Sequence, residues 1–200
     1  MTRQVVKAIA RSGKQIDNMA LAVVKTYQPE ILSAPQPFNV ESFFELELPS
    51  FRNITTDYQE LSGNVHAFTD ISNMKCVVSV HLIENPSQRR FLRSTLSHEI
   101  GHCDIHVPEF RLRKALAKFV HAGDHQTLRL HREELIRIYE NPEWQAWRYA
   151  GALMMPEPSV LLAARQGRSK ADMCEIFDLN MPFVETRLRA LKIADKIKDL

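Results

Sequence analysis

The residues whose types and spacing could do chemistry are concentrated in the segment Ser97-His98-Glu99-Ile100-Gly101-His102. Two histidines four positions apart lie about 40° apart around a helix, one turn above the other, so both imidazoles can reach one metal ion. Glu99 points to a neighbouring sector and could accept a proton from a water molecule that the ion activates. Two imidazoles and one carboxylate suit zinc and leave a coordination position open for that water. The segment therefore predicts a zinc-dependent hydrolase with His98 and His102 as ligands and Glu99 as the base.

The His-Glu-x-x-His pattern also fits a helix with two surface histidines, so its surroundings matter. The helix has a good start at Asn85-Pro86, and it follows a β-rich segment whose edge strand could hold an extended substrate. Gly101 costs the helix up to about 1 kcal/mol relative to alanine, which predicts that another segment packs closely at this point. The competing interpretation is that the fold simply tolerates this cost.

A third ligand has to come from another segment, and Glu143 is the candidate. It follows Pro142 at the start of a predicted helix over 143–154. Ala146 and Ala150 continue one face of that helix, and their small side chains allow a close approach to the helix that carries the histidines. A carboxylate in the first turn is also an ordinary surface feature, because the helix dipole favours it there. The residues alone leave both interpretations open.

Three further residues near the motif have structural interpretations that we prefer. His106 lies four residues beyond His102, but a fourth protein ligand would close the site to catalysis, so we expect His106 to support a ligand or to end the helix. Cys103 is rotated about 100° from His102 and is expected to be a small buried side chain. His81, at the end of the last predicted strand, is expected on the surface.

Composition and charge restrict the other functions. The 200-residue chain has 44% hydrophobic and 25% charged residues, which is typical of a folded protein. Its net charge of +2 is too weak to indicate a polyanionic partner by itself. We find no apolar run of about eighteen residues and no apolar stretch typical of a signal peptide at the N-terminus. Three scattered cysteines fit reduced thiols, so we expect a cytoplasmic protein with no membrane partner. They are Cys76, Cys103 and Cys174.

The elements that must position these residues follow from local patterns. Apolar periodicity predicts a helix over residues 1 to about 27, and the prolines of 28–38 indicate a connector. Runs of β-branched and aromatic residues within 51–83, separated by turn-forming residues, predict a small antiparallel sheet of about three strands. The helix that carries the histidines is expected over about 86–105.

The C-terminal segment 157–200 predicts a helix, a break near Gly167, and two further helices joined around residues 178–180, in the manner of a helix-turn-helix. A helix that reads DNA needs exposed side chains that contact bases and phosphates. The last helix offers few of them, so we favour a structural or partner-docking role over DNA binding. Its basic residues are Arg187, Arg189 and Lys192.

The chain is expected to divide into an N-terminal helix with its connector at 1–38, a metallopeptidase core at 39–156, and a helical tail at 157–200. The stretch 107–139 is predicted to be helical but polar. We interpret it as a solvated helical face, with a substrate-docking surface as the alternative.

The sequence resembles the ImmA/IrrE family of zinc metallopeptidases over about residues 40–192. Two blocks carry the resemblance: RRFLRSTLSHEIGH, and a second block whose family form is Glu-x-x-Ala-x-x-Phe-Ala-x-x-Leu-Leu-Met-Pro. Tyr149 and Met154 replace the Phe and the first Leu of that form, and Trp147 stands where the family often has a small polar residue. The matching residues of the second block are Glu143, Ala146, Ala150, Leu153, Met155 and Pro156.

The resemblance implies that His98, His102 and Glu143 bind Zn²⁺ and that Glu99 is the catalytic base. We therefore expect an α+β fold with a zincin-like core, formed by the small antiparallel sheet and the His-Glu-x-x-His helix, and a tail that resembles a helix-turn-helix. The resemblance also implies an intracellular endopeptidase whose substrate is a helix-turn-helix transcriptional repressor. The alternative is a regulatory or toxin–antitoxin-type module that acts by binding protein or DNA. Glu99 argues against this alternative, because a scaffold does not need the base.

Overall fold

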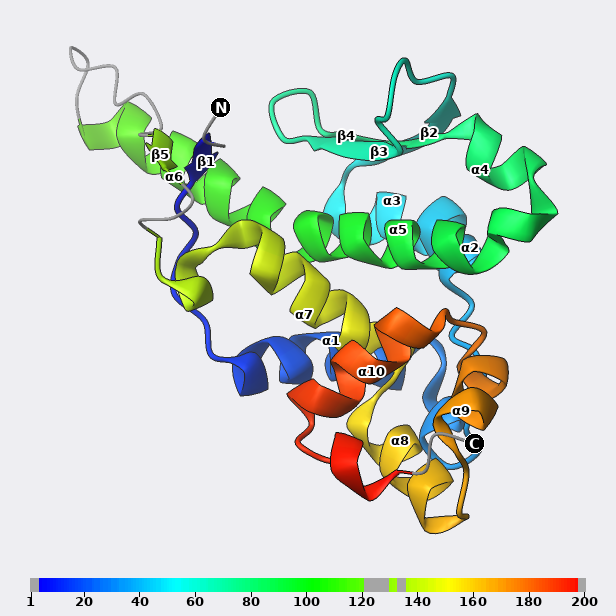
Figure 1. Ribbon diagram of the computed structural model, residues 1–200. Helices are drawn as coiled ribbons and strands as arrows, with labels where there is room; N and C mark the ends of the chain where they lie inside the picture. The colour runs from blue at the N-terminus through cyan, green and yellow to red at the C-terminus, as the bar shows by residue number, and fades with distance from the viewer. Residues whose placement is uncertain (1–3, 121–129, 133–135, 198–200) are drawn as a thin grey trace.

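The computed structural model describes residues 4–120, 130–132 and 136–197. It is a mixed α and β fold in which helices predominate (Figure 1). The helices are α1 (Gly13–Tyr27), α2 (Val40–Ser42), α3 (Leu48–Arg52), α4 (Val80–Glu84), α5 (Arg89–Gly101), α6 (Val107–Val120), α7 (Pro142–Met154), α8 (Glu157–Arg165), α9 (Lys170–Phe177) and α10 (Met181–Ala190). The strands are β1 (Gln4–Val6), β2 (Thr55–Gln59), β3 (Ala67–Asp70), β4 (Lys75–Ser79) and β5 (Leu130–Arg132).

Helix α7 lies at the centre of the molecule. It packs against α5 on one side and against α1 and α10 on the other, and the sheet covers the opposite side of α5 (Figure 1). A single hydrophobic cluster runs from Ile16 in α1 to Ile197 near the C-terminus. The three segments that we distinguished in the sequence therefore share one core.

The three-stranded sheet is mixed, so the prediction of an antiparallel sheet is wrong for one of its two strand pairs. Strand β4 pairs antiparallel with β3 and parallel with β2, and it lies between them. A short turn joins β3 to β4, in which the Asp70 carboxylate accepts hydrogen bonds from the backbone N–H groups of Ser72 and Asn73. Turn residues predict such a hairpin, but they do not reveal that its second strand inserts beside β2. The apolar run Cys76-Val77-Val78 is fully buried, as a central strand requires.

The N-terminal helix begins later than predicted. Residues 4–6 form β1, which pairs antiparallel with β5. Helix α1 then begins after Ser12, whose hydroxyl accepts from the N–H of Gln15, while the Gln15 side chain accepts from the N–H of Ser12. This reciprocal cap closes the helix end, and residues before it pair with a distant strand instead.

The helix that carries the histidines begins at Asn85-Pro86, as the sequence predicted. The Asn85 side chain accepts from the Ser87 N–H, a single 3-10 turn follows over Pro86–Gln88, and α5 continues from there. A π-helical segment, His102–His106, connects α5 directly to α6. Of the stretch 107–139, α6 is helical as predicted, whereas β5 was not expected. Residues 121–129 and 133–135 of this stretch lie outside the described residues.

The tail has the three predicted helices, α8, α9 and α10. Gly167 and Asp178 adopt left-handed backbone angles, with φ of 73° and 52°, and they separate the three helices. Arg187 is 2% exposed and donates to the Met155 carbonyl and the Asp17 carboxylate, so it is not a surface side chain. None of the helices in the described part of the chain has the length and hydropathy needed to span a membrane.

Candidate metal centre

The three predicted ligands converge on one point between α5 and α7. His98 lies in the last turn of α5, His102 begins the π-helical segment, and Glu143 lies in the first turn of α7. The Nε2 atoms of the two histidines are 3.1 Å apart. Glu143 Oε2 is 3.4 Å from His98 Nε2, and Glu143 Oε1 is 3.7 Å from His102 Nε2. These residues form a group that could hold a metal ion.

The spacing of the donor atoms fits a small tetrahedral ion. Ligands at 2.0–2.1 Å from such an ion are separated by about 3.3 Å along the edges of the tetrahedron. The separation of 3.1 Å between the two Nε2 atoms, and those of 3.4 and 3.7 Å from these atoms to the two different oxygens of Glu143, bracket this value. An ion could therefore contact all three side chains with little rearrangement of them.

Gly101 allows α5 and α7 to approach closely enough for this arrangement. A Cβ atom on Gly101 would lie 2.9 Å from the Ala146 carbonyl oxygen and 3.0 Å from Ala146 Cα. The φ of Gly101 is an ordinary helical −59°, so space and not backbone conformation requires glycine. The expectation that a neighbouring segment packs closely at Gly101 is confirmed.

The start of α7 directs Glu143 toward the histidines. The Asn141 side chain accepts hydrogen bonds from the N–H groups of Glu143 and Trp144, at 2.8 and 3.3 Å, and Pro142 occupies the first helical position. This cap fixes the first turn of α7 where it meets α5. The carboxylate is also 28% exposed, so the open side of the site faces solvent.

Glu99 lies beside this group with its side chain buried, at 6% exposure. Its Oε2 accepts a hydrogen bond of 2.6 Å from the hydroxyl of Thr69, which belongs to β3. Burial raises the pKa of Glu99 above its ordinary value, although the Thr69 hydrogen bond and the charge of His98 oppose this shift, while the charge of Glu143 adds to it. The sheet thus holds one oxygen of the carboxylate in place. Sequence reasoning did not identify Thr69, because its position depends on the strand register.

His106 contacts His102, a predicted ligand. Its Nδ1 lies 3.0 Å from His102 Nδ1, and it is 1% exposed. Burial, followed by the charge of His102, holds the pKa of His106 well below its usual range. Cys103 is fully buried as expected. His81 lies on the surface near Glu84, again as expected.

Trp147 offers an apolar surface next to His98, a predicted ligand, and the sequence indicated this residue only as a departure from the family pattern. Its ring centroid lies 4.2 Å from that of His98, and the side chain is 47% exposed. The ring centroid of Phe183 in α10 lies 6.5 Å from that of Trp147. The tail therefore borders the candidate metal centre.

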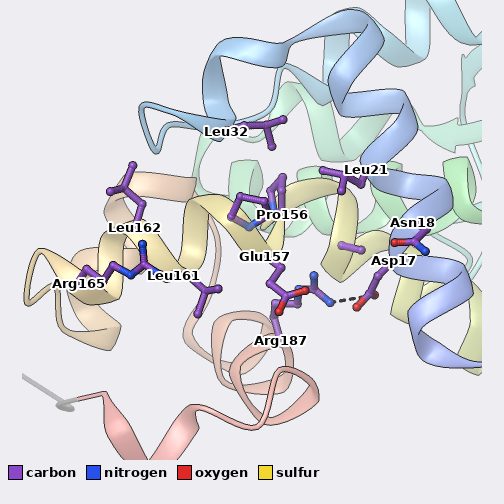
Figure 2. Close-up of a pocket in the computed structure, with 12 residues that line it drawn as sticks. Asp17, Asn18, Leu21, Leu32, Pro156, Glu157, Leu161, Leu162, Arg165 and Arg187 are labelled. Carbon is purple, nitrogen blue, oxygen red and sulfur yellow. Dashed lines mark hydrogen bonds and ion pairs between the residues drawn. The ribbon is translucent and has the colours of Figure 1, made fainter.

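A pocket of about 470 Å³ lies elsewhere, between α1 and α8. Figure 2 shows Asp17 and Arg187 paired at one end of this pocket and Leu161 and Leu162 at the other. None of the predicted site residues lines it. The pocket is separate from the candidate metal centre.

Comparison with known proteins bears on the fold alone. No protein-family model matches the chain, and no curated protein matches it. Among solved structures, the chain is similar to a "Mycobacterium tuberculosis transcriptional regulator", with a TM-score of 0.55 and 13% sequence identity. The similarity covers 88% of this chain and 47% of that one, so this chain spans about half the length of its structural neighbour.

Proposed function

We propose that the protein is a zinc-dependent endopeptidase in which His98, His102 and Glu143 bind the ion. One observation carries the proposal: the Nε2 atoms of His98 and His102 and the two carboxylate oxygens of Glu143 have separations close to those of a tetrahedral site, and the buried carboxylate of Glu99 lies near enough to interact with the charges of His98 and Glu143. Two imidazoles and one carboxylate are a donor set that suits zinc and leaves a position open. The zincin-like core and the resemblance to the ImmA/IrrE family belong to the same proposal.

The chemistry follows from the two oxygens of Glu99. A zinc ion bound here would supply a Lewis acid that activates water and polarises the scissile carbonyl group. Because Oε2 accepts the hydrogen of Thr69, we assign Oε1 as the oxygen that takes the proton from water and passes it to the leaving amine. Burial makes this carboxylate a stronger base than an exposed one, because it raises the pKa of Glu99.

An extended peptide is the substrate that the surroundings of the site favour. Strand β3 lies at the edge of its sheet and carries Thr69, so a peptide that pairs with β3 would run close to Glu99. Trp147 offers an exposed apolar surface beside His98 for a substrate side chain. The resemblance to the family points further, to a helix-turn-helix repressor as the protein that is cleaved.

The Glu99→Gln variant tests the proposal. The protein is co-expressed with a candidate helix-turn-helix repressor, cleavage is followed by mass spectrometry, and zinc is measured by elemental analysis. We expect Glu99→Gln to retain zinc and to lose cleavage, whereas the surface variant Glu84→Gln should retain both. Cleavage that persists in Glu99→Gln at the wild-type rate contradicts the assignment of the base.

The alternative is a regulatory module that acts by binding DNA or protein. The description of the structural neighbour as a transcriptional regulator favours it. The burial of Arg187 speaks against DNA reading by α10, because this side chain pairs with Asp17 instead of facing solvent. Fluorescence anisotropy with duplex DNA at two salt concentrations tests whether the protein binds DNA. DNA binding that weakens with salt, together with regulation in cells that Glu99→Gln does not change, would favour the binding module over the peptidase.

A further inference from the structure

The side chain of Gln145 has only one orientation that its surroundings allow. It is fully buried, one turn after the start of α7. Its Nε2 lies 2.8 Å from the carbonyl oxygen of Ile9 and 2.7 Å from that of Tyr139. Carbonyl oxygens only accept hydrogen bonds, so the amide nitrogen must point at them and use both of its hydrogens. The carbonyl oxygen of Gln145 then points the other way, where it can only accept.

That oxygen determines which nitrogen of His106 carries a hydrogen. Gln145 Oε1 lies 3.3 Å from His106 Nε2 and 3.2 Å from Arg11 Nη1. Because Oε1 cannot donate, His106 Nε2 must carry the hydrogen of this contact. A neutral imidazole carries a single hydrogen, and in His106 this contact places it on Nε2. His106 Nδ1 is therefore a lone-pair acceptor.

The acceptor at His106 Nδ1 in turn determines which nitrogen of His102 carries a hydrogen. His106 Nδ1 and His102 Nδ1 are 3.0 Å apart, so one of them must donate. With His106 Nδ1 as the acceptor, His102 carries its hydrogen on Nδ1 and keeps the lone pair on Nε2. This Nε2 is the atom that faces His98 Nε2 at 3.1 Å and Glu143 Oε1 at 3.7 Å. The lone pair thus lies where a metal ion would be held.

We infer that Gln145 is a positioning residue that sets the tautomer and ring orientation of the ligand His102, acting through His106. This inference rests on the proposed metal centre. Within the described residues, the Nδ1 atom of His98 is buried without a hydrogen-bond partner. The hydrogen bonds from Gln145 therefore reach His102 but not His98. A hydrogen bond to the distal nitrogen of a ligating histidine fixes its tautomer and strengthens it as a ligand.

The segment before α1 completes this chain of hydrogen bonds. Glu109 of α6 is buried and accepts from the Ile9 N–H at 2.7 Å and from Arg11 Nη1 at 2.8 Å. These contacts bring the Ile9 carbonyl group to Gln145 Nε2 and the Arg11 guanidinium to Gln145 Oε1. The residues between β1 and α1 therefore help to orient Gln145, although they lie about a hundred positions away in sequence from Glu109.

The test combines a tautomer measurement with a binding measurement on the full chain. Long-range ¹H–¹⁵N spectra of the chelator-treated protein, labelled at histidine, report which ring nitrogen of His102 carries hydrogen. Zinc affinity is measured by competition with a chromophoric chelator. We expect the Nδ1–H form of His102 in the wild type. In Gln145→Met, which has a similar shape but no amide, we expect an increased Nε2–H form and zinc affinity lower by about 10- to 100-fold.

Two further variants separate this role from a merely structural one. Gln145→Glu, with a protonated carboxyl group, keeps an acceptor toward His106, so it should retain the Nδ1–H form. His106→Phe removes the acceptor itself and should reproduce the effects of Gln145→Met, and it replaces that variant if Gln145→Met does not fold. The inference would be overturned if the folded Gln145→Met or His106→Phe variant kept the wild-type tautomer of His102 and the wild-type zinc affinity. Neither the tautomer nor the zinc affinity depends on cleavage. If both change as expected but the protein cleaves no substrate, only the proposed peptidase activity is contradicted, and the role of Gln145 stands.

Discussion

The backbones at Gly101 and Ala146 lie so close together that position 101 has no room for a side chain. A Cβ atom at Gly101 would lie 2.9 Å from the Ala146 carbonyl oxygen, a backbone atom that can move only if α7 moves. Since α7 carries Glu143 and α5 carries His98, this contact limits the distance between two proposed ligands that come from different helices.

The Gly101→Ala variant should therefore destabilise the protein and weaken the metal centre together. Alanine gains up to about 1 kcal/mol in helix propensity, but overpacking against a backbone should cost about 1–3 kcal/mol. Urea unfolding measures the net loss, and chelator competition measures the zinc affinity. In the control Gly151→Ala, the new Cβ would lie 3.3 Å from Arg187 Cδ, a wider separation than the 2.9 Å to a backbone atom at Gly101, so the loss should be smaller. Equal stability of Gly101→Ala and wild type would contradict the close contact.

Removal of the Glu143 carboxylate should release the metal while leaving the fold intact. The side chain is 28% exposed and lies in a capped first turn, so Glu143→Ala removes a ligand without opening a cavity in the core. We expect zinc content after dialysis to fall to a small fraction of that of the wild type, with an unchanged circular dichroism spectrum. Glu157→Ala, a change in the first turn of the next helix, is the control and should retain zinc. Full zinc content in Glu143→Ala would require another third ligand.

Thr69→Val should slow the reaction without affecting metal retention. The substitution keeps the side-chain shape but removes the hydroxyl that donates to Glu99 Oε2 at 2.6 Å. The buried carboxylate then loses both its orientation and a hydrogen bond worth about 1.5–3 kcal/mol. We expect kcat to fall by roughly tenfold or more, with KM and zinc content close to those of the wild type. Thr69→Ser restores the hydroxyl and should restore kcat; if both variants are equally slow, the hydrogen bond is not the cause.

The parts of the site that the sequence predicts are those that depend on neighbours within one helix. The spacing of His98 and His102, the proline before Glu143 and the glycine at 101 are local patterns, and each leads to the observed geometry. Thr69 and Gln145 act through contacts with residues 30 or more positions away, so no local pattern marks them. The same reason explains the errors in the fold: strand β4 inserts beside β2, and residues 4–6 pair with β5, because of long-range pairing that propensities do not encode.

Asp178 should stabilise the attachment of the tail to α5 in a pH-dependent way. Its carboxylate accepts from Arg89 at 2.7 Å and Arg90 at 3.2 Å, and it lies 3.4 Å from the buried Arg93 guanidinium. Burial raises the pKa of Asp178, but its interactions with these arginines outweigh burial and the net shift is downward. Because the folded-state pKa lies below the unfolded value of about 3.9, the stabilisation is present above that pH and is lost as the pH falls through the folded-state pKa.

The Asp178→Asn variant tests this linkage. Asparagine tolerates the left-handed backbone at this position, where φ is 52°, so the change removes charge and not conformation. We expect the free energy of unfolding at pH 7 to fall by about 1–3 kcal/mol, and the two proteins to become equally stable as the medium is made more acidic. The exposed Asp195→Asn is the control and should leave the unfolding midpoint unchanged. A difference between Asp178→Asn and wild type that stays constant down to acidic pH would contradict the electrostatic origin, because protonated aspartate no longer differs in charge from asparagine.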